Sequence, residues 1–201
     1  MAPGQAAALL DYLALLSLWN RTYNLTAVRE PSRMLGLHLV DCLGVVEPLR
    51  RQRAGSTKTS LLDVGSGGGL PGVVLAIMEP HSTVTCVDAV AKKTSFIRQV
   101  AATLRLPNLH AEHGRVESLL SGVLYDVVVA RAFGSLTHFA QSTAHRLAEG
   151  GAWMAMKGKR PDLEIEAVSA DIDVFHVEPL PLLASVGERC IVWMRPRVVY
   201  P

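Results

Sequence analysis

The segment LLDVGSGGGLPGVVLAI, residues 61–77, restricts the fold of this chain more than any other stretch. An apolar run leads into five residues of which four are glycine, and a second apolar run follows. Glycine has no side chain to hold a ligand away from the backbone, so such a loop brings a small molecule against bare peptide groups. The segment therefore predicts a strand, a ligand-binding loop and a helix in succession.

The chain after this loop alternates short Val-rich runs with helical patterns. Strands are predicted at 60–65, 83–89, 108–114, 125–132 and 150–158, and helices at 72–78, 91–106 and 135–148. Nearly continuous apolar strands between helices are typical of a parallel sheet covered on both faces. A further helix is predicted after Pro161, and then two strands at 173–180 and 189–196 that form an antiparallel edge hairpin. The predicted fold class is α/β, with a doubly wound, mostly parallel sheet.

Two helical patterns precede the sheet region. Apolar residues recur at spacings of three and four through residues 6–19 and again through 31–49, with Pro31 in a first turn. The polar, basic stretch 50–60 connects them to the rest of the chain. We expect a helical cap at 1–58 and a ligand-binding domain at 59–201, together forming one compact unit.

Composition excludes several classes of protein. A hydrophobic content of 49% over 201 residues supports one folded core, and a net charge of +2 is too small to establish nucleic-acid binding by itself. The three cysteines are widely spaced and odd in number, which indicates reduced thiols. The sequence starts with no secretion signal and contains no run of 18 apolar residues, so a cytoplasmic protein without membrane contact is expected.

The glycines of the loop fit a dinucleotide fingerprint. Gly67, Gly69 and Gly72 form a GxGxxG pattern, and Asp88 follows at the end of the next strand, where an acid binds a ribose. An NAD-dependent oxidoreductase with a Rossmann-type fold is therefore one hypothesis.

The same loop also fits a methyl-donor site. Asp63, Gly65, Gly67 and Gly69 form the DxGxGxG pattern of enzymes that use S-adenosylmethionine. We expect Asp63 to face the ligand, where it repels a pyrophosphate and attracts the ammonium and sulfonium groups of the methyl donor. Asp88 suits the donor's ribose hydroxyls. This electrostatic argument favours S-adenosylmethionine as the cofactor.

Five segments in sequential order resemble the ribosomal RNA small-subunit methyltransferase G family (RsmG, also called GidB). The glycine loop runs directly into Leu-Pro-Gly, as in that family. WNRTYNLTAVREPSRMLGLHLVDCL at 19–43, GRVE at 114–117, VVVARAF at 127–133 and MKG at 156–158 are similar to its other motifs. The resemblance covers about residues 19–160.

The resemblance implies methyl transfer to N7 of a guanine in small-subunit (16S) ribosomal RNA by an enzyme with the class I methyltransferase fold. It also implies a donor site that includes Gly65, Leu70, Val116, Glu117 and Arg131. From its place at the end of a strand, Arg131 suits either the donor's carboxylate or an RNA phosphate. A structural ion pair with Asp63 or Glu117 is the alternative.

No catalytic base is expected, because guanine N7 carries a lone pair and no proton. Catalysis then rests on orientation and proximity. His38 and Asp41 lie three residues apart on one predicted helix, where they either shape the guanine or donor pocket or form a structural hydrogen bond. Lys157 follows a strand and is placed to reach a phosphate. No residues have metal-ligand spacing, so no metal is expected.

Three basic clusters are candidates for contact with RNA: residues 50–53 with Lys58, residues 157–160 and residues 195–197. Solvated surface is the alternative for each. A non-catalytic RNA-binding scaffold with the same fold is a further hypothesis beside the two enzymes. We expect a monomer whose partner is small-subunit ribosomal RNA or a ribosomal particle.

Overall fold

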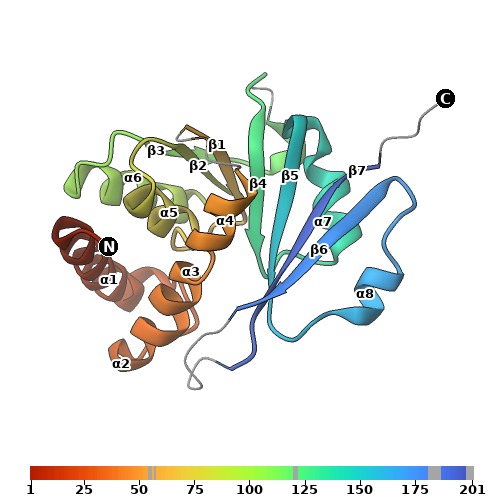
Figure 1. Ribbon diagram of the computed structural model, residues 1–201. Coiled ribbons are helices and arrows are strands. Elements are labelled where there is room, and N and C mark those ends of the chain that lie inside the picture. Colours follow the sequence, from red (N-terminus) through yellow and green to blue (C-terminus); the bar gives the residue numbers. More distant parts are fainter. Residues whose placement is uncertain (54–55, 57, 120–121, 181–186, 198–201) are drawn as a thin grey trace.

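The computed structural model describes residues 1–53, 56, 58–119, 122–180 and 187–197, and its centre is a seven-stranded sheet (Figure 1). The strands are ordered β3-β2-β1-β4-β5-β7-β6. Their bounds are Ser60–Val64 (β1), Thr83–Asp88 (β2), Leu109–His113 (β3), Tyr125–Arg131 (β4), Leu147–Lys157 (β5), Ile172–Pro179 (β6) and Cys190–Pro196 (β7).

The sheet confirms the predicted doubly wound topology. Strands β1 to β5 pair in parallel, whereas β7 is antiparallel to both β5 and β6. The predicted edge hairpin is therefore present, although β7 pairs with β5 and leaves β6 at the edge; the connection at 181–186 lies outside the described residues. The strand order reverses between β1 and β4. Ligands of open α/β sheets bind outside the carboxyl ends of the strands at such a reversal.

Helices cover both faces of the sheet (Figure 1). Successive side chains of β1 face opposite sides, so that Leu61 joins the core under α1, α5 and α6 while Leu62 joins the core under α7. The helices of the sheet region are Gly72–Met78 (α5), Ala91–Thr103 (α6), Leu136–Thr143 (α7) and Asp162–Glu166 (α8), with short 3₁₀ turns at Val116–Ser118 and Ala144–Arg146. Within the described ranges, no helix is long and apolar enough to cross a membrane.

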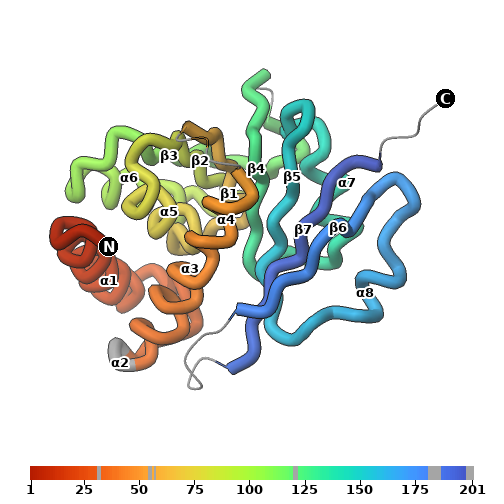
Figure 2. Tube along the Cα trace, viewed as in Figure 1, coloured from red at the N-terminus to blue at the C-terminus, as the bar shows by residue number. Residues whose placement is uncertain are grey.

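The N-terminal helices belong to the same core as the sheet. Helix α1, Pro3–Tyr23, is longer than the predicted 6–19, and its buried Leu9 and Leu16 pack in the cluster that includes α5 and α6. Figure 2 shows this segment, in red and orange, beside the yellow and green helices.

The second predicted helix, 31–49, is divided. It comprises Pro31–Met34 (α2), a π-helical stretch at Leu35–Val40 and Asp41–Leu43 (α3), and after a turn at Gly44 it continues as Val46–Gln52 (α4). In the π-helical stretch, the Asp41 amide donates to the Gly36 carbonyl five residues back. Glycine has low helix propensity, which is consistent with the break at Gly44.

Candidate active site

The glycine loop connects the carboxyl end of β1 to α5. Gly65, Gly67 and Gly69 have φ angles of 67°, 58° and 89°, which residues with side chains rarely adopt. A Cβ atom on Gly69 would lie 2.4 Å from Val73 Cγ2. The Leu70 side chain is 3% exposed and packs in the core, so any contact it makes with a ligand falls to its backbone. The alternating glycines are thus required by the backbone path and by packing.

Asp63 lies beneath this loop. Its side chain is fully buried, and Oδ2 accepts a hydrogen bond from the Gly72 amide at 2.8 Å. Burial raises the pKa of Asp63 to about 7, although the Gly72 amide and the charge of Arg131 act in the opposite direction. The alternation along β1 turns Asp63 toward α5, so the carboxylate lines neither cavity at the carboxyl ends of the strands, and its expected contact with the ligand stays a prediction. Its position makes it an anchor for the amino end of α5.

Asp88 ties the glycine loop to β2. Its Oδ2 accepts from the Gly67 amide at 2.9 Å, and its Oδ1 accepts from the Val90 amide at 2.9 Å. Lys93 Nζ lies 3.5 Å from the same carboxylate. Each carboxylate oxygen has a second lone pair, so Asp88 retains capacity to accept from a ligand.

A cavity of about 280 Å³ lies at the carboxyl ends of β1 and β2. Four of the predicted donor-site residues line it, namely Gly65, Asp88, Val116 and Glu117. The cavity therefore combines exposed backbone, an apolar wall and two carboxylates. These groups suit an adenosine ligand, because Val116 can flank the base and the two carboxylates can accept hydrogen bonds from the ribose hydroxyls and from the base edge.

Two aromatic rings that were not singled out as site residues complete this cavity. Phe133 and His138 line it and stack with their ring centroids 5.6 Å apart and an interplanar angle of 3°. A Cβ atom on Gly65 would lie 3.0 Å from the Phe133 ring. Phe133 was quoted only as part of a motif, and no pattern in the sequence pairs it with a histidine five residues later.

The turn after β4 separates this cavity from a second one. Arg131 and Ala132 line the second cavity, whereas the next residue, Phe133, lines the first. Ala132 has a φ angle of 56°, a conformation that costs about 1 kcal/mol for a residue other than glycine. The backbone is therefore held in a strained conformation where the two cavities meet.

The second cavity has a volume of about 500 Å³ and brings together four more of the predicted site residues. His38, Asp41, Arg131 and Lys157 all line it, together with Arg189 from the residues before β7. Arg189 was not predicted, because a single arginine beside an apolar strand carries no distinctive pattern. Three cations and one buried carboxylate are thus gathered around one cavity.

Asp41 links two of these cations. Its Oδ2 lies 3.3 Å from Arg131 Nη1 and its Oδ1 lies 2.9 Å from Arg189 Nε. Arg131 also donates to the Leu37 carbonyl at 3.3 Å. The structural partner of Arg131 is therefore Asp41, and neither Asp63 nor Glu117 takes that place.

His38 and Lys157 are held by other residues. His38 Nε2 lies 2.9 Å from Thr26 Oγ1, and burial, aided by the charge of Arg131, lowers the pKa of His38. Lys157 bonds the Glu164 carboxylate at 2.8 Å and the Gly134 carbonyl at 3.1 Å. His38 is thus neutral near pH 7, and Lys157 is already partly compensated.

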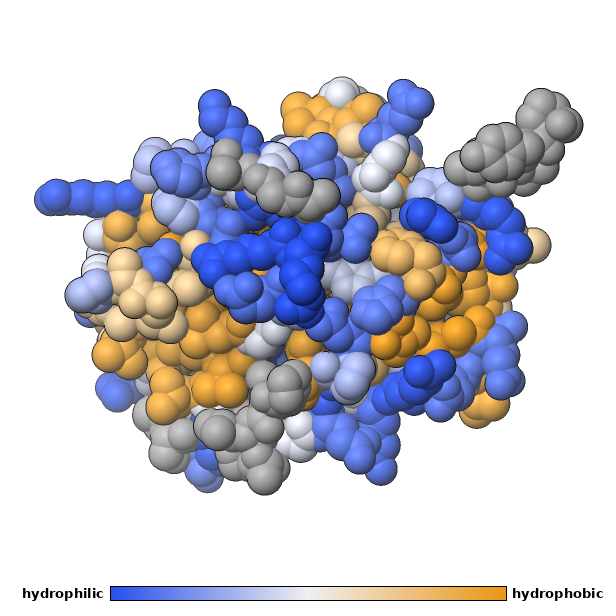
Figure 3. All heavy atoms as spheres, viewed as in Figure 1, coloured by the Kyte–Doolittle hydropathy of each residue, from blue (hydrophilic) through white to orange (hydrophobic). Residues whose placement is uncertain are grey.

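The arginines of residues 50–53 bind acidic side chains of their own chain. Arg50 and Arg53 bond the two carboxylate oxygens of Glu79 at 2.7 and 2.6 Å, and Arg51 pairs with Glu178. Residues 50–52 form the end of α4. Figure 3 shows hydrophilic side chains gathered over this helix. Their ion pairs weaken the case for this cluster as an RNA contact.

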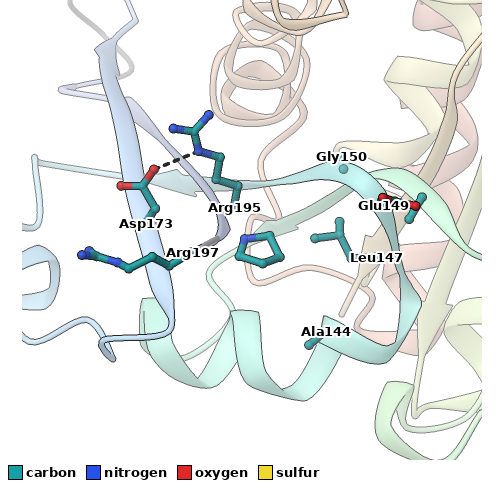
Figure 4. Close-up of a pocket in the computed structure, with 10 residues that line it drawn as sticks. Ala144, Leu147, Glu149, Gly150, Asp173, Arg195 and Arg197 are labelled. Atoms are coloured by element: carbon teal, nitrogen blue, oxygen red, sulfur yellow. Dashed lines mark hydrogen bonds and ion pairs between the residues drawn. The ribbon is translucent and has the colours of Figure 1, made fainter. Parts of the chain in front are cut away.

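A third cavity, of about 790 Å³, is lined by residues at the start of β5, the start of β6 and the end of β7. Figure 4 shows Arg195 bonded to Asp173 beside Arg197, with Arg195 Nε 2.8 Å from the carboxylate. None of the predicted donor-site residues lines this cavity. In the described part of the chain, no group of three or more His, Cys, Asp or Glu side chains is placed to hold a metal ion.

Comparisons with known proteins agree with this architecture. A family model described as rRNA small subunit methyltransferase G matches residues 5–192. A ribosomal RNA small subunit methyltransferase G from Leptothrix cholodnii is 58% identical over 195 residues, covering 97% of this chain and 88% of the relative. The Bordetella pertussis protein of that name is 53% identical, covering 96% and 85%.

Solved structures share the fold at low sequence identity. The N-methyltransferase NodS from Bradyrhizobium japonicum, in complex with S-adenosyl-l-homocysteine, has a TM-score of 0.62 at 12% identity and covers 90% of this chain and all of its own. MtNAS has a TM-score of 0.66 at 11% identity, covering 96% and 74%. The family match and the relatives extend over nearly the whole sequence. This chain belongs to the ribosomal RNA small subunit methyltransferase G family.

Proposed function

We propose that this protein transfers a methyl group from S-adenosylmethionine to N7 of a guanine in small-subunit ribosomal RNA. One observation carries the proposal: two cavities of different chemistry lie at the carboxyl ends of the strands, and successive residues of the turn after β4, Ala132 and Phe133, line one and the other. One suits an adenosine group and the other is rich in cations. The donor, when bound, supplies an electrophilic methyl group on a sulfonium sulfur.

The smaller cavity is proposed to hold the adenosine end of the donor. Asp88 accepts from the ribose hydroxyls, Val116 flanks the base, and Glu117 accepts from its amino edge. Gly65, Gly67 and Gly69, with the backbone of Leu70, bring peptide groups close to the ligand. Asp63 contributes indirectly by anchoring α5.

Arg131 is proposed to bind the carboxylate of the donor's methionine portion. Arg131 lines the second cavity next to the turn after β4. Its side chain is 25% exposed, so its guanidinium is accessible to a ligand. A charge-assisted hydrogen bond from arginine to a carboxylate is strong and directional. This contact would place the sulfonium methyl near the boundary of the two cavities.

The second cavity, which is lined by Arg131 and Arg189, is proposed to receive the target guanine nucleotide. Arg189 and Lys157 provide positive charge for its phosphates, and His38 presents a neutral ring. Attack by N7 requires no proton removal, so these residues act by holding the nucleotide in line with the methyl group. No residue is assigned as a general base.

A methyl-transfer assay tests the proposed function. The protein is incubated with S-adenosylmethionine carrying a tritiated methyl group and with small subunits that lack the modification, and the product nucleotide is mapped by strand cleavage at 7-methylguanosine. Label at one guanine N7 supports the proposal. Absence of label would indicate an RNA-binding scaffold, and binding of NAD in place of the methyl donor would indicate an oxidoreductase.

Replacing Arg189 by alanine is expected to weaken binding of the RNA substrate. One of the two cations beside Asp41 would be lost, so the KM for small subunits should rise about tenfold, corresponding to about 1.4 kcal/mol, while the affinity for S-adenosylhomocysteine should stay within about twofold. Steady-state kinetics and calorimetry measure the two quantities. Arg98→Ala is the control, because Arg98 is exposed on α6 and bonds only the Ala111 carbonyl among the described residues. An unchanged KM in Arg189→Ala would remove Arg189 from the target site.

A monomeric enzyme is part of the proposal. Sedimentation of the free protein measures its oligomeric state. A metal-independent reaction in the cytoplasm completes the proposal, and full activity after removal of divalent ions by a chelator is the expected result.

A further inference from the structure

One glycine of the loop, Gly68, belongs to neither of the two glycine motifs, and it packs against residues of the N-terminal helix. The Tyr12 hydroxyl donates a hydrogen bond to the Gly68 carbonyl oxygen at 2.7 Å. A Cβ atom on Gly68 would lie 2.8 Å from Leu16 Cδ1. Tyr12 and Leu16 are both fully buried on α1. Helix α1 therefore approaches the loop so closely that a side chain at position 68 would require Leu16 to move.

Helix α1 also contacts the carboxyl end of α5, the helix that follows the glycine loop. Gln5 Nε2 donates to the carbonyl oxygens of Ile77 and Met78 at 3.1 and 3.3 Å, where α5 ends. One helix thus contacts both the loop that precedes α5 and the last turn of α5. Such contacts restrict how the loop and α5 can move relative to the sheet.

The loop is held from two sides at adjacent residues. The Gly67 amide donates to Asp88 Oδ2 at 2.9 Å, and the carbonyl of the next residue, Gly68, accepts from Tyr12 at 2.7 Å. Glycine has the largest conformational freedom of all residues, so a loop with four glycines has many accessible conformations unless contacts select one. These two hydrogen bonds fix the orientation of two peptide groups of the loop, 66–67 and 68–69.

We infer that Tyr12 is a positioning residue for the methyl donor, because its hydroxyl holds the glycine loop in the conformation that binds the donor. Neither Tyr12 nor Gly68 lines the donor cavity; Tyr12 acts through the loop, whose first glycine, Gly65, does line it. The inference rests on the proposed use of S-adenosylmethionine. Without the hydroxyl, the binding-competent conformation of the loop becomes less populated, and the apparent affinity for the donor falls by that factor.

The test replaces Tyr12 by phenylalanine, which keeps the ring and removes the hydroxyl. Calorimetry with S-adenosylhomocysteine is expected to show a dissociation constant about five- to tenfold higher, the size of effect that one buried hydrogen bond produces. The KM for S-adenosylmethionine should rise by a similar factor, while the KM for small subunits should not change. Loss of stability alone does not produce this split between the two substrates.

Two control variants separate positioning from general loss of stability. Thr143→Val also removes a buried hydroxyl, which accepts from Trp153 Nε1 at 2.9 Å on the other face of the sheet, and it should lower the melting temperature without changing donor affinity. Tyr23→Phe removes a hydroxyl from the 41% exposed last residue of α1 and should change neither. Wild-type donor affinity in Tyr12→Phe, or equal weakening in Thr143→Val, would overturn the inference while leaving the proposed function intact. Failure of the wild-type protein to bind S-adenosylhomocysteine would overturn both.

Discussion

Replacing Asp63 by asparagine is expected to make the free energy of unfolding nearly independent of pH between about pH 4 and pH 7. In the wild-type protein, the titration of Asp63 should lower this free energy over the same range. Burial raises the pKa of Asp63 from 3.8 to about 7, so in this range the folded protein binds a proton that the unfolded chain has released. The stability present below pH 3.8 is therefore lost progressively as the pH rises to about 7. The difference in pKa corresponds to about 4 kcal/mol, an upper value for the effect. Denaturant unfolding at a series of pH values measures it.

The asparagine variant retains an oxygen that can accept from the Gly72 amide and carries no charge at any pH. Its free energy of unfolding should therefore change little over the same range. Asp126→Asn provides the control, because Asp126 is exposed at the start of β4 and bonds Ser60, and this variant should keep the wild-type pH dependence. A wild-type slope in Asp63→Asn would show that another group titrates.

The same variant discriminates between the two roles considered for Asp63. If it anchors α5, the affinity of Asp63→Asn for S-adenosylhomocysteine should stay within about twofold of wild type. A fall of about tenfold or more would restore the expectation drawn from the sequence, in which the charge itself attracts the donor.

Arg131→Ala is expected to reduce kcat/KM for methyl transfer at least about 100-fold, which is about 2.7 kcal/mol. The substitution removes the proposed partner of the donor's carboxylate and leaves Asp41, whose side chain is 5% exposed, with Arg189 alone. Truncating one member of a buried charge pair typically costs 2–5 kcal/mol. Arg131→Lys keeps the charge but loses the geometry of the guanidinium, so an intermediate loss is expected.

Measurements of donor affinity and unfolding must accompany the Arg131 kinetics. If Arg131 binds the donor, the dissociation constant of S-adenosylhomocysteine should rise while the variant remains folded. The exposed Arg98→Ala should behave as wild type in each measurement. Full activity of Arg131→Ala would refute both the donor-binding role and the requirement for its ion pair with Asp41.

The sheet topology and the position of the site were predictable because each depends on local patterns. Apolar strands alternate with helices along the sequence, and the loops after β1 and β4 follow directly from the strand ends. Gly65, Asp88, Val116 and Glu117 lie together because carboxyl ends of parallel strands meet at one edge. Motifs that end strands therefore predicted that these four residues line one cavity.

Contacts between distant segments were not predictable in this way. Arg189 reaches Asp41 across 148 positions, and Tyr12 reaches Gly68 across 56. Neither residue lies in a pattern that specifies a partner. The direction of Asp63 was also missed, although the period of two along β1 could have shown that it shares a face with the buried Leu61.

The π-helical stretch at Leu35–Val40 gives two neighbouring polar side chains different directions. Three residues along an α-helix are separated by about 60° around the axis, whereas the wider π turn spreads them to about 115°. His38 accordingly contacts Thr26 in the segment after α1, while Asp41 contacts the arginines beside β4 and β7. One helical turn therefore joins the arginines beside β4 and β7 to the segment after α1, and residues from all of these elements line the same cavity.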